Sequence, residues 1–181
     1  MTNTDAVREK AIRTITDAAN RSELEVHNAV IDLRRNAERG DEEMLWPLLD
    51  YDDDMVVAAT LFALFHVFGQ KSDLKDLIFK LAAEGDPRDI GIMPIQCEAL
   101  RILASLAKSD TNALATLRQV AENTSAADTT KECAWRELAE LHGLEWSDKY
   151  SGSLIGDPES AESERIRERI RAAIRDKKSD A

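Results

Sequence analysis

Leu64-Phe65-His66-Val67-Phe68 is the stretch of sequence that decides the fold. Ala99-Leu100-Arg101-Ile102-Leu103 begins 35 residues later, and Ala134-Trp135-Arg136-Glu137-Leu138 begins after a further 35. The first, second and fifth positions are apolar in all three segments, and we expect them to be buried. A helical period of about 20–50 residues is typical of a stacked solenoid, because one repeat cannot bury its apolar face alone. The repeat therefore predicts an all-α protein that binds other macromolecules.

Helical periodicity and capping signals extend from this repeat over most of the chain. Ser22 and Glu25 have the spacing of a capping box, apolar residues follow at i, i+3, i+4 and i+7, and Gly40 marks a stop. No segment shows the sustained alternation of a strand. We expect helices over residues 5–19, 22–37, 42–49, 54–68, 73–83, 95–107, 112–122 and 129–142.

One segment also resembles a known family. It reads Leu45-Trp-Pro-Leu-Leu-Asp50-Tyr-Asp-Asp-Asp54-Met-Val-Val-Ala-Ala59-Thr-Leu-Phe-Ala-Leu64, and it is similar to a HEAT repeat in its Pro-bearing helix, its Asp-rich turn and its Ala/Leu-rich second helix. Val57 replaces the usual Arg, and the later repeats lack the Asp-x-x-Val signature. The resemblance covers residues 41–143. It implies a short α-solenoid of antiparallel helix pairs whose second helices line a concave face, and it implies no single activity.

The C-terminal part of the sequence differs from the repeats. We expect residues 1–143 to form the solenoid from two N-terminal helices and three repeats, residues 144–157 to form a loop, and residues 158–181 to form a charged helix. Acidic residues early in that helix and basic residues late in it suit the helix dipole. Its apolar stripe is narrow, so it is either a cap over the last repeat or an arm that engages a partner. The stripe consists of Ile166, Ile170 and Ile174.

The charge of the chain favours one class of partner. The 181 residues carry a formal net charge of −11. Binding of nucleic acid needs clustered Lys and Arg, so an acidic chain is better suited to a basic protein. The N-terminal residues do not resemble a signal peptide, and the longest apolar stretch, residues 56–69, is too short to span a bilayer. We expect a cytoplasmic monomer without membrane or nucleic-acid contacts.

The acidic residues are concentrated in one part of the chain. Residues 41–90 contain 12 acidic and 4 basic residues, many of them in turns. Such an acidic edge can steer a basic partner, or it can serve helix capping and solubility. Asp50, Asp52 and Asp54 match the start of a calcium loop, but Met55 and Leu61 stand where Gly and Glu are required, so we expect no metal. The edge comprises Asp41, Glu42, Glu43, Asp50, Asp52, Asp53, Asp54, Glu84, Asp86 and Asp89.

A second candidate surface follows from helical geometry. At about 100° per residue, His66 lies on the side of its helix opposite to Leu64 and Phe65. Arg and aromatic side chains are enriched at the centres of protein interfaces. The strip is therefore a candidate contact surface, unless its residues are only solvated or are covered by the first two helices. Its members are Phe62, His66, Gln70, Cys97, Arg101, Ser105, Glu132, Arg136 and Glu140.

Catalysis has little support in the sequence. The three histidines are scattered, and the motifs HExxH, GxSxG, GxGxxG and GxxxxGK[ST] do not occur. Cys97 and Cys133 are best explained as small, semi-buried helical residues. A Cys97–His66 pair would need an orienting group that the sequence does not identify. We therefore expect no enzyme activity and no cofactor.

Three functions remain after these considerations. The first is a stoichiometric binder or inhibitor of one basic protein, of the immunity or antitoxin kind, which covers a positive cleft of a toxin. The second is an adaptor or assembly scaffold in a larger complex. The third is base repair of nucleic acid, which is kept because some HEAT-like proteins are DNA glycosylases. The partner surface that we expect consists of Asp50, Asp52, Asp53, Asp54, Phe62, His66, Arg101, Glu132, Arg136 and Glu140.

Overall fold

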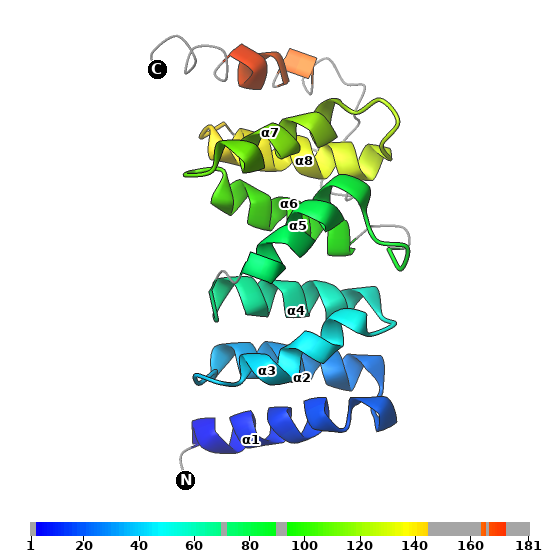
Figure 1. The fold of residues 1–181 in the computed structure, drawn as a ribbon, viewed down its shortest axis with the longest axis vertical. Helices are drawn as coiled ribbons and strands as arrows, with labels where there is room; N and C mark the ends of the chain where they lie inside the picture. Colours follow the sequence, from blue (N-terminus) through cyan, green and yellow to red (C-terminus); the bar gives the residue numbers. More distant parts are fainter. Residues whose placement is uncertain (1–2, 70–71, 90–93, 145–163, 166, 173–181) are drawn as a thin grey trace. The chain divides into compact units, whose positions relative to one another are not determined.

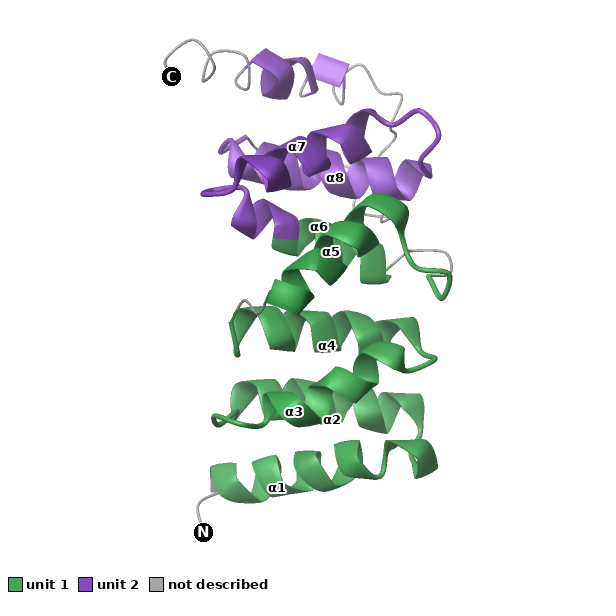
Figure 2. Cartoon of the chain, viewed as in Figure 1, with its two compact units in different colours: residues 1–102 green, residues 103–181 purple. Residues whose placement is uncertain are grey.

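The computed structural model describes residues 3–69, 72–89, 94–144, 164–165 and 167–172 (Figure 1). In these ranges the chain is helical and contains no strand, which confirms the all-α prediction. It divides into two compact units, residues 1–102 and residues 103–181 (Figure 2). The helices are α1 (Asn3–Thr16), α2 (Glu23–Arg35), α3 (Glu42–Leu45), α4 (Asp54–His66), α5 (Ser72–Glu84), α6 (Pro94–Leu106), α7 (Thr111–Glu122) and α8 (Asp128–Leu141).

In the first unit, α1 packs against α2 and α2 packs against α4. The start of α2 is set by the predicted capping box: the amide of Glu25 donates to Ser22 Oγ at 3.3 Å, and the amide of Ser22 donates to Glu25 Oε2 at 3.0 Å. Val26, Val30 and Leu33 form the buried face of α2. The first helix ends earlier than expected, at Thr16, and a short 3-10 helix follows it (Ala18–Asn20).

The helix expected over residues 42–49 is split in two. The α-helix α3 ends at Leu45, and a 3-10 helix, η2 (Trp46–Asp50), continues the chain. Pro47 has no amide hydrogen for the i→i−4 ladder, and its ring disfavours a continuing α-helix. The tighter 3-10 turn keeps Leu45, Leu48 and Leu49 buried.

The helix α4 is the most apolar element of the first unit. Asp53 caps it, because the amide of Val56 donates to Asp53 Oδ1 at 2.9 Å. The helix ends at His66, two residues before the predicted end. Phe68 lies beyond the last turn and is only half-buried, so the prediction that it belongs to the core is wrong.

The burial of the three repeated segments confirms most of the predicted helical phase. The first two columns are buried in every segment, and the third column, His66, Arg101 and Arg136, is exposed or half-exposed. In the fifth column, Leu103 and Leu138 are fully buried. The matching positions of the three segments therefore have matching burial on three helices, apart from Phe68. The solenoid arrangement and the HEAT resemblance stay predictions.

Polar contacts fix the start of α6 in the first unit. The amides of Ile95 and Gln96 donate to the two carboxylate oxygens of Asp89 at 2.8 and 2.9 Å. The side-chain amide of Gln96 donates to the carbonyl of Ala82 on α5 at 3.1 Å. Residues 90–93 of the same connection lie outside the described ranges.

In the second unit, α7 packs against α8. Asp110 caps α7 by accepting from the amides of Asn112 and Ala113. Residues 164–165 and 167–172 are helical, and Ile170 is fully buried. Of the predicted stripe, Ile166 and Ile174 lie outside the described part, as do residues 145–163 and 173–181. The domain boundaries expected from the sequence stay a prediction.

Candidate partner-binding surface

Five side chains of the first unit form what we call the arginine–aromatic cluster. Arg34, Phe62, His66, Glu98 and Arg101 make it up. The Phe62 and His66 rings lie 4.4 Å apart, and the guanidinium of Arg34 lies 4.4 Å from the centroid of the Phe62 ring. An Nη1 atom of Arg101 donates to Glu98 Oε2 at 2.7 Å. The rings of Phe62 and His66 are thus in contact, and Arg101 is near enough to lower the pKa of His66.

Helical spacing accounts for most of these contacts. Phe62 and His66 are one turn apart on α4, and Glu98 and Arg101 are three residues apart on α6, so each pair lies on one helix face. Arg34 comes from the last turn of α2, which packs against α4. The sequence reasoning did not find Arg34 or Glu98. The i, i+3 spacing from Arg101 is a signal for Glu98, whereas Arg34 is joined to Phe62 only by the packing of two helices.

The electrostatics of the cluster follow from its two arginines and one buried acid. Burial raises the pKa of Glu98, and the positive charges of Arg101 and Arg34 partly oppose this. Its Oε1 atom is buried and has no hydrogen-bond partner within the described residues. Desolvation by the surrounding protein lowers the pKa of His66, and Arg101 and Arg34 lower it further. Burial and the two positive charges thus all disfavour the protonated form of His66.

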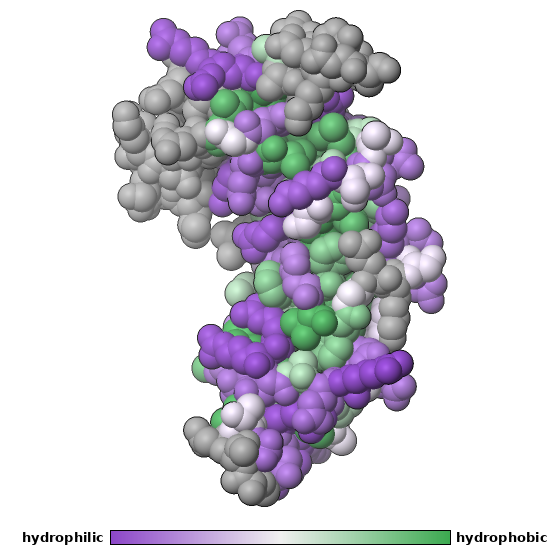
Figure 3. All heavy atoms as spheres, turned by 90° about the vertical axis from the view of Figure 1, so that its left-hand side faces the viewer, coloured by the Kyte–Doolittle hydropathy of each residue, from purple (hydrophilic) through white to green (hydrophobic). Residues whose placement is uncertain are grey.

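The cluster is accessible from solvent. His66 and Arg101 are exposed, and Arg34 and Phe62 are half-buried. Val67, directly after His66, is 40% exposed. The face that contains the C-terminal end of α4 carries hydrophobic side chains among hydrophilic ones (Figure 3). Stacked guanidinium and aromatic groups with limited side-chain freedom are suited to contact another protein, since little rotamer entropy remains to be lost.

Some aspartates of the turn before α4 make contacts within the fold, and others are exposed to solvent. Asp53 caps α4 through its Oδ1 atom and is half-buried, so it has a role within the fold, whereas its place in the partner surface stays a prediction. Asp54 is the first residue of α4 and is half-buried. Asp50 and Asp52 are exposed. These two carboxylates are therefore the part of the turn that a partner can reach.

A nearby arginine fixes the backbone behind this turn. The Nη1 atom of Arg88 donates to the carbonyls of Leu49 and Tyr51, each at 2.8 Å, while Nη2 pairs with Asp86 at 2.7 Å. This hydrogen bond from Arg88 is the main cause that lowers the pKa of Asp86. The backbone before this turn is consequently held by two hydrogen bonds from a half-buried cation, which is itself paired with Asp86.

Several acids of the predicted edge serve the fold instead of the surface. Asp41 is buried and accepts from Arg8 of α1 at 2.6 and 2.9 Å. Glu42 accepts from the amide of Gly40, and Asp89 caps α6. Of the two uses that we considered for the acids of residues 41–90, these side chains therefore have the structural one. Others, such as Glu43, Asp50, Asp52 and Glu84, are exposed.

In the second unit, one predicted contact residue is not accessible. Glu132 is only 4% exposed, and its carboxylate lies 3.7 Å from Arg167 of the C-terminal helical segment. The prediction that Glu132 faces outward is wrong, because its side chain is buried beside Arg167. Arg136 is half-buried and donates to the sulfur of Cys133 at 3.5 Å, and Glu140 is exposed.

The two cysteines, His66 and the acidic side chains are the groups that bear on catalysis and metal binding. Cys97 and Cys133 are half-buried helical residues, as expected, and neither is a free thiol in the structure, so His66 has no thiolate with which to form a nucleophilic pair. Within the described ranges, no group of three or more His, Cys, Asp or Glu side chains is placed to hold a metal ion. The helices described also include none with the length and apolarity needed to cross a bilayer.

Comparisons with known proteins add no further constraint. No protein-family model matches the sequence, and searches of curated proteins and of solved structures returned no similar protein.

Proposed function

We propose that this chain is a non-catalytic protein-binding module whose partner is a basic protein. The observation that supports this most is the position of two accessible features on one helix. The exposed Asp50 and Asp52 precede the N-terminal end of α4, and the arginine–aromatic cluster lies at its C-terminal end.

The distance between these features suits a single interface. With 13 residues, α4 is about 20 Å long at about 1.5 Å per residue. A protein interface of standard size covers about 800 Å² on each partner, which is wide enough to include both ends of such a helix. One partner can therefore be steered by the carboxylates and held by the stacked side chains.

The two features contribute to different steps of binding. Exposed carboxylates in a chain of net charge −11 raise the rate at which a basic protein is encountered. Aromatic and Arg side chains in the desolvated centre of an interface mainly slow dissociation. An inhibitor that covers a positive cleft, as an immunity or antitoxin protein does, uses both steps, and this is the form of binder that we propose.

The test begins with capture of partners from the native host and continues with binding kinetics. We expect a basic protein to be captured in a one-to-one complex. The double variant Asp50→Asn/Asp52→Asn should slow its association at low salt and reduce the dependence of the rate on salt.

Glu9→Gln/Asp76→Asn is the matched control, because it removes the same charge from exposed positions on α1 and α5. An equal loss of association rate in both variants would assign the effect to net charge alone. Capture of an acidic protein or of nucleic acid would contradict the proposal outright.

A further inference from the structure

Helices α2 and α4 lie side by side in the first unit and run in the same direction (Figure 1). At their C-terminal ends, the guanidinium of Arg34 contacts the Phe62 ring. At the other end, Glu23 of α2 lies near Tyr51 in the turn before α4: burial raises the pKa of Tyr51, and the negative charge of Glu23 raises it further. Each of these pairs is separated by 28 residues along the chain, so the two helices are packed in register. We call the surface that they share the α2–α4 surface.

The two ends of the α2–α4 surface carry opposite charges. At the C-terminal end, the carboxylate of Glu98 is bonded to Arg101 at 2.7 Å, so these two charges compensate each other and the charge of Arg34 remains. Burial lowers the pKa of His66 at this end, and the positive charges of Arg101 and Arg34 lower it further. The exposed acids of the N-terminal end are Glu23, Asp50 and Asp52.

Arg34 is held in position without an acceptor for its side-chain hydrogen bonds. Its guanidinium lies over the Phe62 ring, 4.4 Å from the centroid, and the residue is half-buried. Within the described residues, this guanidinium forms no ion pair and no hydrogen bond. The helix dipole favours a cation in the last turn of α2, but this applies equally to the exposed Arg35 and does not explain the contact with Phe62. A guanidinium that is already ordered on a ring loses little side-chain entropy when it binds an acceptor.

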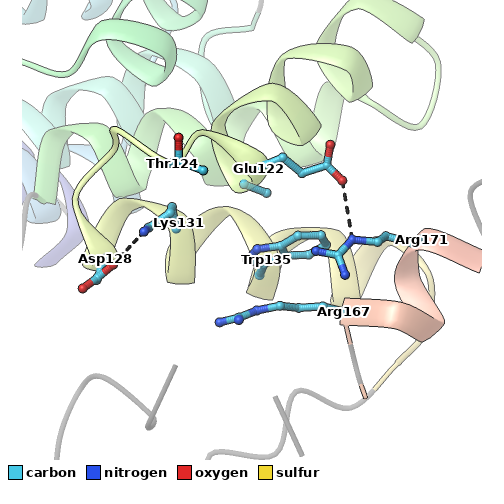
Figure 4. A pocket seen from close by; sticks show the side chains of 8 residues that line it. Glu122, Thr124, Asp128, Lys131, Trp135, Arg167 and Arg171 are labelled. Atoms are coloured by element: carbon cyan, nitrogen blue, oxygen red, sulfur yellow. Dashed lines mark ion pairs between the residues drawn. The ribbon is translucent and has the colours of Figure 1, made fainter. Parts of the chain in front are cut away.

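A second arginine on an aromatic ring shows how such a cation is satisfied within the chain. In the second unit, the guanidinium of Arg171 lies 5.1 Å from the centroid of the Trp135 ring. Two carboxylates of the same unit pair with it, Glu122 at 3.6 Å (Figure 4) and Glu164 at 2.8 Å. Arg34 has the ring without the carboxylates, so its N–H groups are left to solvent or to a partner.

A carboxylate is the acceptor that suits Arg34 best. The planar guanidinium donates two parallel hydrogen bonds to a carboxylate, a geometry that fixes the position of the acid as well as its charge. A phosphate accepts in the same way, but the net charge of −11 repels a polyanion such as nucleic acid. A single Asp or Glu on an otherwise basic protein meets no such repulsion.

We propose that Arg34 binds an Asp or Glu side chain of the basic partner, while the acids at the opposite end of the α2–α4 surface contact its basic residues. This inference rests on the proposed function, because it assigns contacts of the same partner. The two contacts lie about 20 Å apart, the length of the 13-residue helix α4 at about 1.5 Å per residue. Opposite charges at this separation allow the partner to bind in one orientation only, because the reversed orientation places like charges together.

Carbodiimide crosslinking tests the contact directly, with the partner captured from the native host as the probe. This reagent joins an amine to a carboxylate that touches it and adds no spacer. In Arg34→Lys, the introduced amine should couple to an Asp or Glu of the partner, which mass spectrometry of the crosslinked peptides identifies. Arg35→Lys places the same amine at the next, exposed position and should not couple. Absence of coupling in Arg34→Lys, or equal coupling in both variants, overturns the proposal.

Binding kinetics with the same partner measure what the contact contributes. Arg34→Gln should speed dissociation about tenfold, the effect of losing one charge-assisted hydrogen bond, whereas Arg35→Gln should leave it unchanged. Arg34→Glu should abolish binding, and replacement of the crosslinked partner acid by Lys should restore it, because the two charges are then exchanged. Thermal unfolding checks that each variant is folded.

The kinetic results separate this inference from the proposed function. If Asp50→Asn/Asp52→Asn slows association as expected but Arg34→Gln and Arg35→Gln dissociate at the same rate, the contact at Arg34 is refuted and the proposed function stands. If the captured partner is not basic, the proposed function fails, and the orientation inferred from it fails as well.

Discussion

The guanidinium of Arg34 on α2 lies 4.4 Å from the centroid of the Phe62 ring on α4. The same ring lies 4.4 Å from that of His66, which is in turn 4.9 Å from the Phe65 ring in an edge-on arrangement. A buried residue, Phe65, is therefore connected by ring contacts to an exposed one, His66. The core of the first unit thus determines the orientation of the side chains on the proposed binding surface.

The effect of neighbouring positive charges on the pKa of His66 can be measured directly. Arg101→Ala removes one of the positive charges that lower the pKa of His66, so this pKa should rise towards its ordinary value. Titration of the histidine ring protons by NMR measures the change, with His66→Gln to assign the signal. Arg35→Ala removes an exposed charge next to Arg34 and serves as the control. An unchanged titration in Arg101→Ala would mean that the two side chains do not interact in solution.

The buried carboxylate of Glu98 should make stability depend on pH. Burial raises its pKa in the folded state, so folding favours the protonated acid, and stability is lost as the pH rises through the raised pKa. Glu98→Gln removes this loss. The melting temperature of the variant relative to wild type should therefore be higher at pH 7 than at pH 4. If the melting temperatures of the variant and the wild type differed by the same amount at pH 4 and pH 7, the negative charge of Glu98 would not lower the stability of the folded protein.

Neighbouring aspartates before α4 should differ in their effect on folding. Asp53→Ala removes the cap of the helix and should lower the free energy of unfolding by about 0.5–2 kcal/mol. Asp52→Ala changes an exposed residue and should alter it by about 0.5 kcal/mol or less. Urea denaturation measures both values. If both variants lost the same free energy of unfolding, helix capping by Asp53 would not contribute to stability.

The buried columns of the repeat can be tested by truncation. Leu103 is fully buried, so Leu103→Ala should cost about 2–5 kcal/mol, as is usual for large-to-small changes in a core. Val67→Ala, at a position that is 40% exposed, should cost less than about 1 kcal/mol. Chemical denaturation of both variants measures this contrast, and its absence would contradict the helical phase assigned to α6.

The arginine–aromatic cluster should control how long the partner stays bound. Arg101→Ala removes a side chain expected at the centre of the interface, so dissociation should accelerate while association changes little. Arg136→Ala, in the second unit, reports whether the partner reaches that part of the chain. Surface-based binding kinetics separate the two rates. A variant that slowed association and left dissociation unchanged would place Arg101 at the rim.

Much of the fold could be predicted from the spacing of residues along single helices. The capping box of Ser22 and Glu25 and the apolar columns follow from spacing along a single helix. The same spacing placed Phe62 and His66 on one face of α4, which is how part of the candidate site was predicted. The prediction for Phe68 failed because the helix ends before this residue, and periodicity does not locate such an end to within a turn.

The sequence by itself determined that the chain is helical, most of the buried faces of its helices and the outward direction of His66 and Arg101, because these depend on the fixed geometry of one helix. Only the tertiary structure decided which charges are available at the surface. Asp41 pairs with Arg8 and Glu132 is buried beside Arg167, whereas Asp50 and Asp52 are left exposed. The physical reason is that ion pairing and burial depend on distances through space between separate elements, and no periodicity along the chain encodes these distances.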